Sequence, residues 1–272
     1  LLGEIELSSL ERAQRKPTEN LSSYELLLKG KALHHKVQKD ALLNALTTFD
    51  DAIKADEKNG QAYAWKACAL GQGLFRGYLE EDFNTVWKQA EDNLKKAREL
   101  NENDFEVHRL MSEVSLAMKD FRAAQRHSKI CYEQVPNDPR VLSVYGEVCL
   151  RTGKVDEGLD AVKLALEIDP VAQGKTNADP RHAAVIFGYY MARDKEGCLE
   201  QINNLEEIDF KSWLLTTKIC RDEEHEFSNL DWFQEGKKLF SDKDFEKEVQ
   251  DFRLNNDSAT ETLISFAKEL FS

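Results

Sequence analysis

The side chains of this sequence that could bind a metal or transfer protons are a few histidines and many carboxylates. His34 and His35 are adjacent, and His225 stands between Glu224 and Glu226. Adjacent residues of a helix point about 100° apart, so they form a poor chelate. No carboxylate pair has neighbours that favour general acid–base work. We expect solvated surface at these positions, with no metal, no cofactor and no catalytic residue.

Glycines and cysteines offer two further kinds of chemistry. Gly71, Gly73 and Gly77 resemble a nucleotide-binding loop, but that fingerprint needs a preceding strand, and a helix is expected here. The 5 cysteines are widely spaced without a CxxC pair, so no disulfide framework is indicated and a reducing compartment fits. We interpret them as small buried hydrophobes rather than nucleophiles. The chain is therefore expected not to be an enzyme.

Charge and hydropathy restrict the kinds of partner. The net charge is -13, from 37 Lys+Arg against 50 Asp+Glu. Such an acidic chain repels nucleic-acid phosphates and anionic lipid headgroups. No run approaches the roughly 18 apolar residues that span a bilayer, and no signal peptide is seen. We expect a cytoplasmic protein, and the start at Leu1 without methionine suggests a piece of a longer polypeptide.

One motif recurs along the chain: a small residue, a larger residue four positions on, and a small or apolar residue three further. The five copies are Ala45, Phe49, Ala52; Ala90, Leu94, Ala97; Ala124, Ser128, Cys131; Gly158, Val162, Ala165; and Cys198, Ile202, Leu205. These spacings place the three residues on one helical face, where small ends let a neighbouring helix approach closely. Another amphipathic helix is predicted before each copy, at about 22–35, 60–72, 105–118, 139–152 and 181–193.

The pattern resembles the tetratricopeptide repeat, a helix pair of about 34 residues. The strongest units are 139–172, with Tyr145, Gly146 and Pro170, and 105–138, with Met111 and Pro136. The resemblance implies an all-α fold, a right-handed superhelix of antiparallel helix pairs. It implies about five pairs over residues 21–210, a connector helix from an upstream domain at 1–20, and C-terminal capping helices at 211–272.

A narrower resemblance is carried by residues 15–24, by Leu28, Lys29 and Gly30, and by residues 245–271. These stretches look like the C-terminal repeat region of bacterial proteins that carry a class III adenylate cyclase or a winged-helix regulator domain. That resemblance implies a bacterial source and a sensory role in signal transduction, with the cyclase outside this chain. The resemblance to the tetratricopeptide repeat, taken by itself, implies a non-catalytic scaffold that binds a protein or peptide.

In tetratricopeptide arrays, the second, fifth, ninth, twelfth and thirteenth residues of each first helix face a ligand in a concave groove. Carrying these offsets over identifies Glu106, Arg109, Glu113, Arg140, Ser143, Glu147, Arg151, His182, Tyr189 and Arg193. The four arginines could bind an acidic peptide or a free carboxylate. The alternative is that arginine and glutamate pair with each other. A second copy of the chain is another candidate partner.

The segment 74–85 is an insertion between two predicted helices and is rich in aromatic residues. It contains Phe75, Tyr78 and Phe83, and Trp87 follows it. An aromatic insertion on a helical repeat can be a binding lobe. We favour a short helix folded back onto its own unit, because large apolar residues rarely stay exposed.

Overall fold

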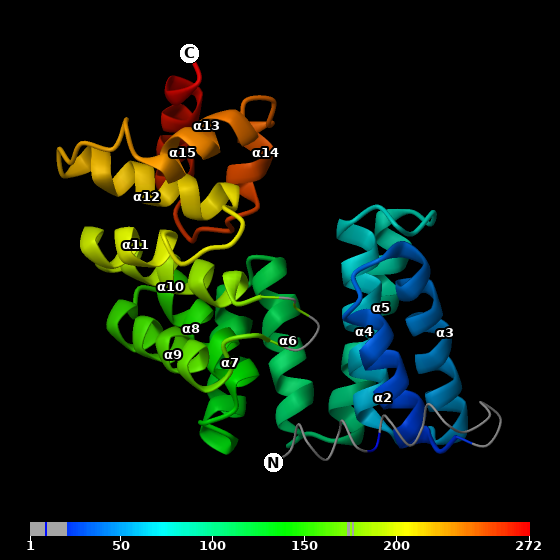
Figure 1. The fold of residues 1–272 in the computed structure, drawn as a ribbon. Coiled ribbons are helices and arrows are strands. Elements are labelled where there is room, and N and C mark those ends of the chain that lie inside the picture. Colours follow the sequence, from blue (N-terminus) through cyan, green and yellow to red (C-terminus); the bar gives the residue numbers. More distant parts are fainter. Residues whose placement is uncertain (1–8, 10–20, 173–174, 176) are drawn as a thin grey trace. The chain divides into compact units, whose positions relative to one another are not determined.

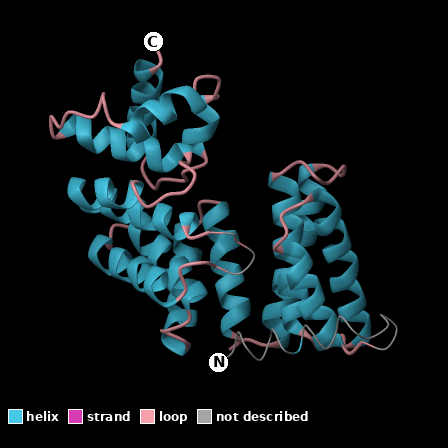
Figure 2. Ribbon diagram, in the orientation of Figure 1, coloured by secondary structure: helices cyan, strands magenta, loops and turns pink. Residues whose placement is uncertain are grey.

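The computed structural model describes Ser9, residues 21–172, Lys175 and residues 177–272. In these residues it contains fourteen α-helices and no strand, which confirms the all-α prediction (Figures 1 and 2). The first seven helices are α2 (Ser23–His34), α3 (Lys39–Ala55), α4 (Gly60–Phe75), α5 (Phe83–Leu100), α6 (Phe105–Ala117), α7 (Phe121–Gln134) and α8 (Pro139–Arg151). The others are α9 (Val155–Ile168), α10 (Asp179–Ala192), α11 (Lys195–Ile202), α12 (Phe210–Asp222), α13 (Asp231–Leu239), α14 (Phe245–Gln250) and α15 (Asp257–Leu270). The predicted connector helix at 1–20 lies outside the described residues, apart from Ser9.

The helices form two compact units, residues 1–114 and 115–272. In the first unit, α2 packs on α3 and α4 on α5; in the second, α8 packs on α9 and α10 on α11. Each pair is a hairpin of consecutive helices joined by a short connection (Figure 1). Every helix of the described residues is too short or too polar to span a lipid bilayer. These four hairpins agree with the predicted fold of antiparallel helix pairs, and the predicted number and bounds of the pairs stay a prediction.

The ends of the helices follow from local side-chain chemistry. Ser22 is the N-cap of α2 and forms a capping box with Glu25. The Ser22 side chain accepts from the Glu25 amide, and the Glu25 side chain accepts from the Ser22 amide. Asp138 begins α8, where its side chain accepts hydrogen bonds from the backbone amides of Arg140 and Val141 and Pro139 fills the first turn. These caps satisfy amide groups that the helix itself leaves without an acceptor. Similar aspartate caps begin α5, α7, α11, α12 and α14.

The small residues of the repeated motif lie where helices meet. Ala45, Ala90 and Ala124 are at most 1% exposed. The closest approach is in the hairpin of α8 and α9, where a Cβ on Gly146 would lie 2.8 Å from the carbonyl oxygen of Gly158. A Cβ on Gly158 would equally lie 2.8 Å from the carbonyl oxygen of Gly146. The motif therefore marks the contact surface between paired helices, as predicted.

Replacing Gly158 by alanine is expected to destabilise the second unit by about 1–3 kcal/mol, because its Cβ would meet the main chain of α8. Alanine's better helix propensity, about 1 kcal/mol, acts in the opposite direction. Urea denaturation followed by circular dichroism measures the change. Gly71→Ala is the matched control, since a Cβ on helical Gly71 meets nothing within 4 Å. Equal stability of the two variants would contradict the close packing.

The segment 76–82 between α4 and α5 is a loop, not a helix. Helix α4 continues to Phe75, beyond its predicted end, and α5 begins at Phe83. Gly77 has a φ of +65°, a backbone conformation that glycine adopts without strain. The expected folded-back helix is therefore wrong: the chain turns at Gly77, and only Leu74, Tyr78 and Leu79 of the insertion pack inward.

The largest core of the second unit includes the C-terminal helices. Trp213 of α12 is fully buried, and its ring contacts those of Phe233, Phe240 and Phe271 at 5.6–5.7 Å between centroids. Phe252, between α14 and α15, belongs to the same core as Phe187 of α10. The chain after α13 thus packs against α10 and α12.

Candidate functional site

Three predicted groove residues, Glu106, Arg109 and Glu113, lie on α6 in the first unit. Arg109 donates to Glu106 from Nε at 3.1 Å and from Nη2 at 3.2 Å, and to Glu113 from Nη1 at 2.6 Å. Glu106 is 2% and Arg109 4% exposed. All three guanidinium nitrogens of Arg109 therefore already have carboxylate acceptors on their own helix.

This ion network extends to the first helices α2 and α4. Lys31 Nζ of α2 lies 3.6 Å from Glu106 Oε1. The ring of Trp65 on α4 has Lys31 Nζ at 5.2 Å and the Arg109 guanidinium carbon at 5.4 Å from its centroid. Both distances fit cation–π contact. Lys31, Trp65, Glu106, Arg109 and Glu113, here called the buried ion network, link three helices of the first unit.

His34, expected at the solvated surface, is instead buried at the edge of this network. Its ring contacts Trp65 at 5.4 Å between centroids, and its Nε2 lies 3.7 Å from Cys68 Sγ. Burial, then the nearby His35, Arg109 and Arg76, lower the pKa of His34 to about 3. Burial likewise raises the pKa of Cys68 to about 12. The histidine is therefore uncharged and the cysteine a thiol at neutral pH, so this pair does not supply a thiolate nucleophile.

The remaining seven predicted groove residues lie in the second unit. Arg140 of α8 pairs with the cap Asp138, its Nη2 lying 2.7 Å from Oδ2. Burial opposes ionisation of Asp138, but the Arg140 guanidinium holds the pKa of that carboxyl below its usual value. Ser143 donates to the carbonyl oxygen of Pro139 and accepts from Arg181. Arg181, which the sequence prediction missed, also binds Asp169 and so joins α10 to the start of α8 and the end of α9.

Glu147 and Arg151 lie further along α8 and meet the C-terminal segment. Arg151 Nη1 is 2.8 Å from Glu147 Oε1. Its Nη2 donates to the carbonyl oxygen of Phe252 at 3.0 Å and its Nε to that of Arg253 at 3.2 Å. Arg151, at a predicted ligand-facing position, is thus bound by two consecutive main-chain carbonyls of this same protein, those of Phe252 and Arg253.

Lys211 of α12 is a second residue that the prediction missed. Its Nζ lies 4.0 Å from the centroid of the Phe187 ring. Burial and the neighbouring Arg151 lower the pKa of Lys211 to about 8, against the opposing effect of Glu147. Lys211 is the second residue of its helix, as Glu106 and Arg140 are of theirs. Extending the repeat offsets to α12 would have found it.

His182, Tyr189 and Arg193 belong to α10 and its C-terminal end. His182 Nδ1 lies 2.7 Å from Gln201 Oε1 on α11, and the Tyr189 ring has Lys163 Nζ at 5.6 Å from its centroid. Arg193 ends α10 in the left-handed conformation with φ 57° and is exposed. Among the four predicted arginines, only Arg193 has no ion pair with the described part of the chain.

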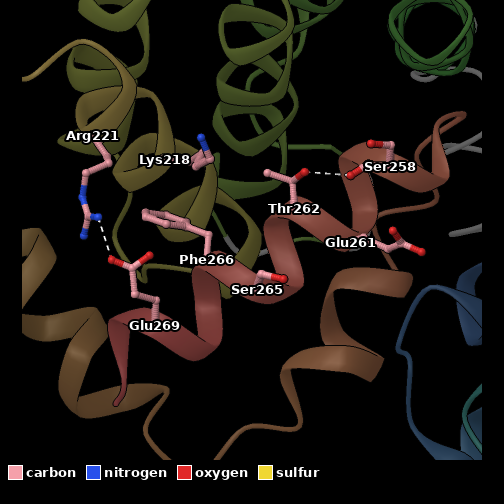
Figure 3. Close-up of a pocket in the computed structure, with 8 residues that line it drawn as sticks. All are labelled: Lys218, Arg221, Ser258, Glu261, Thr262, Ser265, Phe266 and Glu269. Carbon is pink, nitrogen blue, oxygen red and sulfur yellow. Dashed lines mark hydrogen bonds and ion pairs between the residues drawn. The ribbon is translucent and has the colours of Figure 1, made fainter.

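A separate pocket of about 530 Å³ lies between α12 and α15 (Figure 3). Its lining comprises Lys218, Arg221, Ser258, Glu261, Thr262, Ser265, Phe266 and Glu269. Arg221 Nη1 pairs with Glu269 Oε1 at 2.9 Å across the pocket, and both side chains are largely exposed. Two cations balance two carboxylates in this lining, so the pocket favours neither an anionic nor a cationic ligand.

Comparisons with known proteins support the repeat fold. No family model matches the sequence, and no curated protein matches it. Among solved structures, PilF of Pseudomonas aeruginosa superposes with a TM-score of 0.55 at 14% identity, covering 83% of this chain and 98% of that one. The tetratricopeptide repeat protein TTC0263 of Thermus thermophilus gives 0.51 at 18% identity, over 75% of this chain and 100% of that one.

A tetratricopeptide repeat protein of Parabacteroides merdae gives a TM-score of 0.50 at 14% identity, over 96% of this chain and 90% of that one. At such low identities the likeness concerns the fold. It agrees with the predicted helical repeat, and it carries no information on the narrower resemblance to cyclase-associated regions.

Proposed function

We propose that this chain is a non-catalytic scaffold that binds a protein or peptide on the first helices of its second unit. The most direct support is the pair of main-chain carbonyls, of Phe252 and Arg253, that Arg151 binds. A polypeptide backbone on this face can therefore be held by a side chain at a groove position. The helices act by positioning a partner, without making or breaking bonds.

The partner-facing residues we propose are those of α8 and α10 that keep accessible surface. Arg140, Ser143, His182 and Tyr189 are half-buried, and Arg193 is exposed. Arg151 and Arg109 are largely buried and already bind acceptors. Arg193 at the end of α10 is open to one carboxylate of a peptide, and a second carboxylate could compete with Asp138 for Arg140 at the start of α8. We therefore propose an acidic peptide or one with a free carboxylate.

The test measures binding of peptides that end in a free carboxylate and compares it with binding of the same peptides with an amidated C-terminus. The chain is expected to select acidic sequences, and Arg140→Glu with Arg193→Glu to weaken binding at least about tenfold. Lys129→Glu on α7 is the control, because Lys129 is an exposed cation away from the predicted groove positions. Undiminished binding by the double variant would exclude these arginines as the site.

We also propose a cytoplasmic location. All five cysteines are free thiols, and four of them are buried. The pKa values of Cys149 and Cys220 are raised to about 11, first by burial. Unpaired thiols of this kind suit a reducing compartment.

The alternative is that this chain is the regulatory C-terminal region of a bacterial adenylate cyclase, with ligand binding on the repeats controlling the cyclase. It rests on the sequence resemblance of residues 15–24 and 245–271. The reading frame upstream of Leu1 decides it: a cyclase domain there would support it, and its absence would remove it. Cyclic nucleotide production by this chain alone would contradict the non-enzyme proposal.

A further inference from the structure

Three aromatic side chains form a row where α4 ends and α5 begins, and two of them are exposed. The rings of Phe75 and Phe83 meet edge-on at 6.5 Å between centroids, and those of Phe83 and Trp87 stack at 6.3 Å with 13° between planes. Phe75 is 50% and Phe83 48% exposed, and Trp87 is half-buried. Phe75, Phe83 and Trp87 are called the aromatic ridge below.

The ridge is held by a turn that is anchored on both sides. Leu79 packs against Gly73 of α4, and the Tyr78 hydroxyl donates to the carbonyl oxygen of Val37 at 3.4 Å. Asp82 caps α5 by accepting from the amide of Thr85 at 3.1 Å. The exposed rings therefore lie next to Tyr78 and Leu79, two residues of the same insertion that pack inward. Exposed aromatic groups on an anchored turn are a feature of binding surfaces.

Acidic side chains border the ridge. Residues 74–92 contain five carboxylates, Glu80, Glu81, Asp82, Glu91 and Asp92, and two basic residues, Arg76 and Lys88; all seven are exposed. Glu91 Oε1 accepts from the Trp87 indole at 2.8 Å, and Glu81 Oε2 accepts from Gln89 at 3.0 Å. Glu91 is thus held at the edge of the Trp87 ring, and carboxylates and aromatic faces both attract cations.

We propose that the aromatic ridge docks a basic segment of a partner protein, in which lysine or arginine residues alternate with apolar ones. The apolar residues would cover Phe75 and Phe83, and the basic ones would pair with Glu80, Glu81 and Glu91. A second copy of this chain fits less well, because each copy carries a net charge of -13 and repels another. The ridge lies on the α4–α5 hairpin, so this surface is independent of the groove on α8 and α10.

The test uses two synthetic peptides, one in which leucine alternates with lysine and one in which leucine alternates with glutamate, each with a fluorescent label. Fluorescence anisotropy is expected to show that the lysine peptide binds and that its binding weakens as salt is added. Any binding of the glutamate peptide, which the groove proposed above would take, is expected not to depend on the ridge. Phe75→Ser with Phe83→Ser is expected to weaken this binding at least about tenfold. Leu164→Ser with Ile168→Ser, which alters two exposed apolar residues of α9, is the matched control and should bind as the unaltered chain does.

A second variant, Glu80→Gln with Glu81→Gln, alters charge on the exposed loop without removing any buried group. It is expected to weaken binding several-fold and to reduce its dependence on salt. Circular dichroism confirms that each variant is folded. Equal binding of the lysine peptide by the serine variant and the unaltered chain, or an equal loss in the α9 control, would overturn the proposal. Loss of glutamate-peptide binding in the serine variant would overturn it too. Sedimentation showing that the ridge joins two copies would also overturn it.

Discussion

Glu106→Ala is expected to lower the free energy of unfolding of the first unit by about 3–5 kcal/mol, the range for removing one partner of a buried ion pair. Glu106 is 2% exposed and accepts two hydrogen bonds from Arg109, while Lys31 Nζ lies 3.6 Å away. Its removal would leave two cations beside Trp65 with too little negative charge. Urea denaturation, followed by circular dichroism and by tryptophan fluorescence, measures the loss.

The control for this prediction is Asp51→Ala, which breaks the ion pair between Lys54 and Asp51 on α3. Their side chains are 77% and 41% exposed, and exposed pairs contribute about 0–1 kcal/mol. A Glu106→Ala variant no less stable than Asp51→Ala would show that the buried ion network does not support the fold.

Acidification is expected to destabilise the first unit through His34. The folded-state pKa of His34 is about 3, below the ordinary histidine value of 6.5. Between these values the unfolded chain binds a proton that the folded chain does not, so stability falls as the pH drops below about 6.5. At about 1.4 kcal/mol per pH unit, the loss reaches about 3 kcal/mol near pH 4.5.

The physical cause is the surroundings of His34. Its side chain is buried between α2 and α4, with Trp65 and Cys68 on α4 and the cationic Arg109 and Arg76 close enough to disfavour a further positive charge. Denaturation curves at neutral pH and near pH 4.5 should show a smaller stability difference for His34→Gln than for the unaltered chain. An identical pH dependence in both would show that His34 is protonated in the folded state.

The core of each hairpin could be predicted because it depends on residues close in sequence. The small residues of the motif recur at helical spacing, so Ala90 and Ala124 could be assigned to a buried face from the sequence alone. Aspartate and serine caps likewise act within three residues of their own position. The sequence was less informative about residues 74–85, where composition does not show which rings pack inward and which stay exposed.

What the ligand-facing positions contact was decided by tertiary structure. Helical offsets place Arg109 and Arg151 on one face of their helices, but they do not say what lies against that face. Arg109 is covered because α4 brings Trp65 to it, while Lys31 of α2 pairs with its partner Glu106. Arg151 is covered because residues 252 and 253, about a hundred positions later, return to α8. Periodicity is a property of one helix, whereas burial and pairing depend on contacts between segments distant in sequence, which no local spacing encodes.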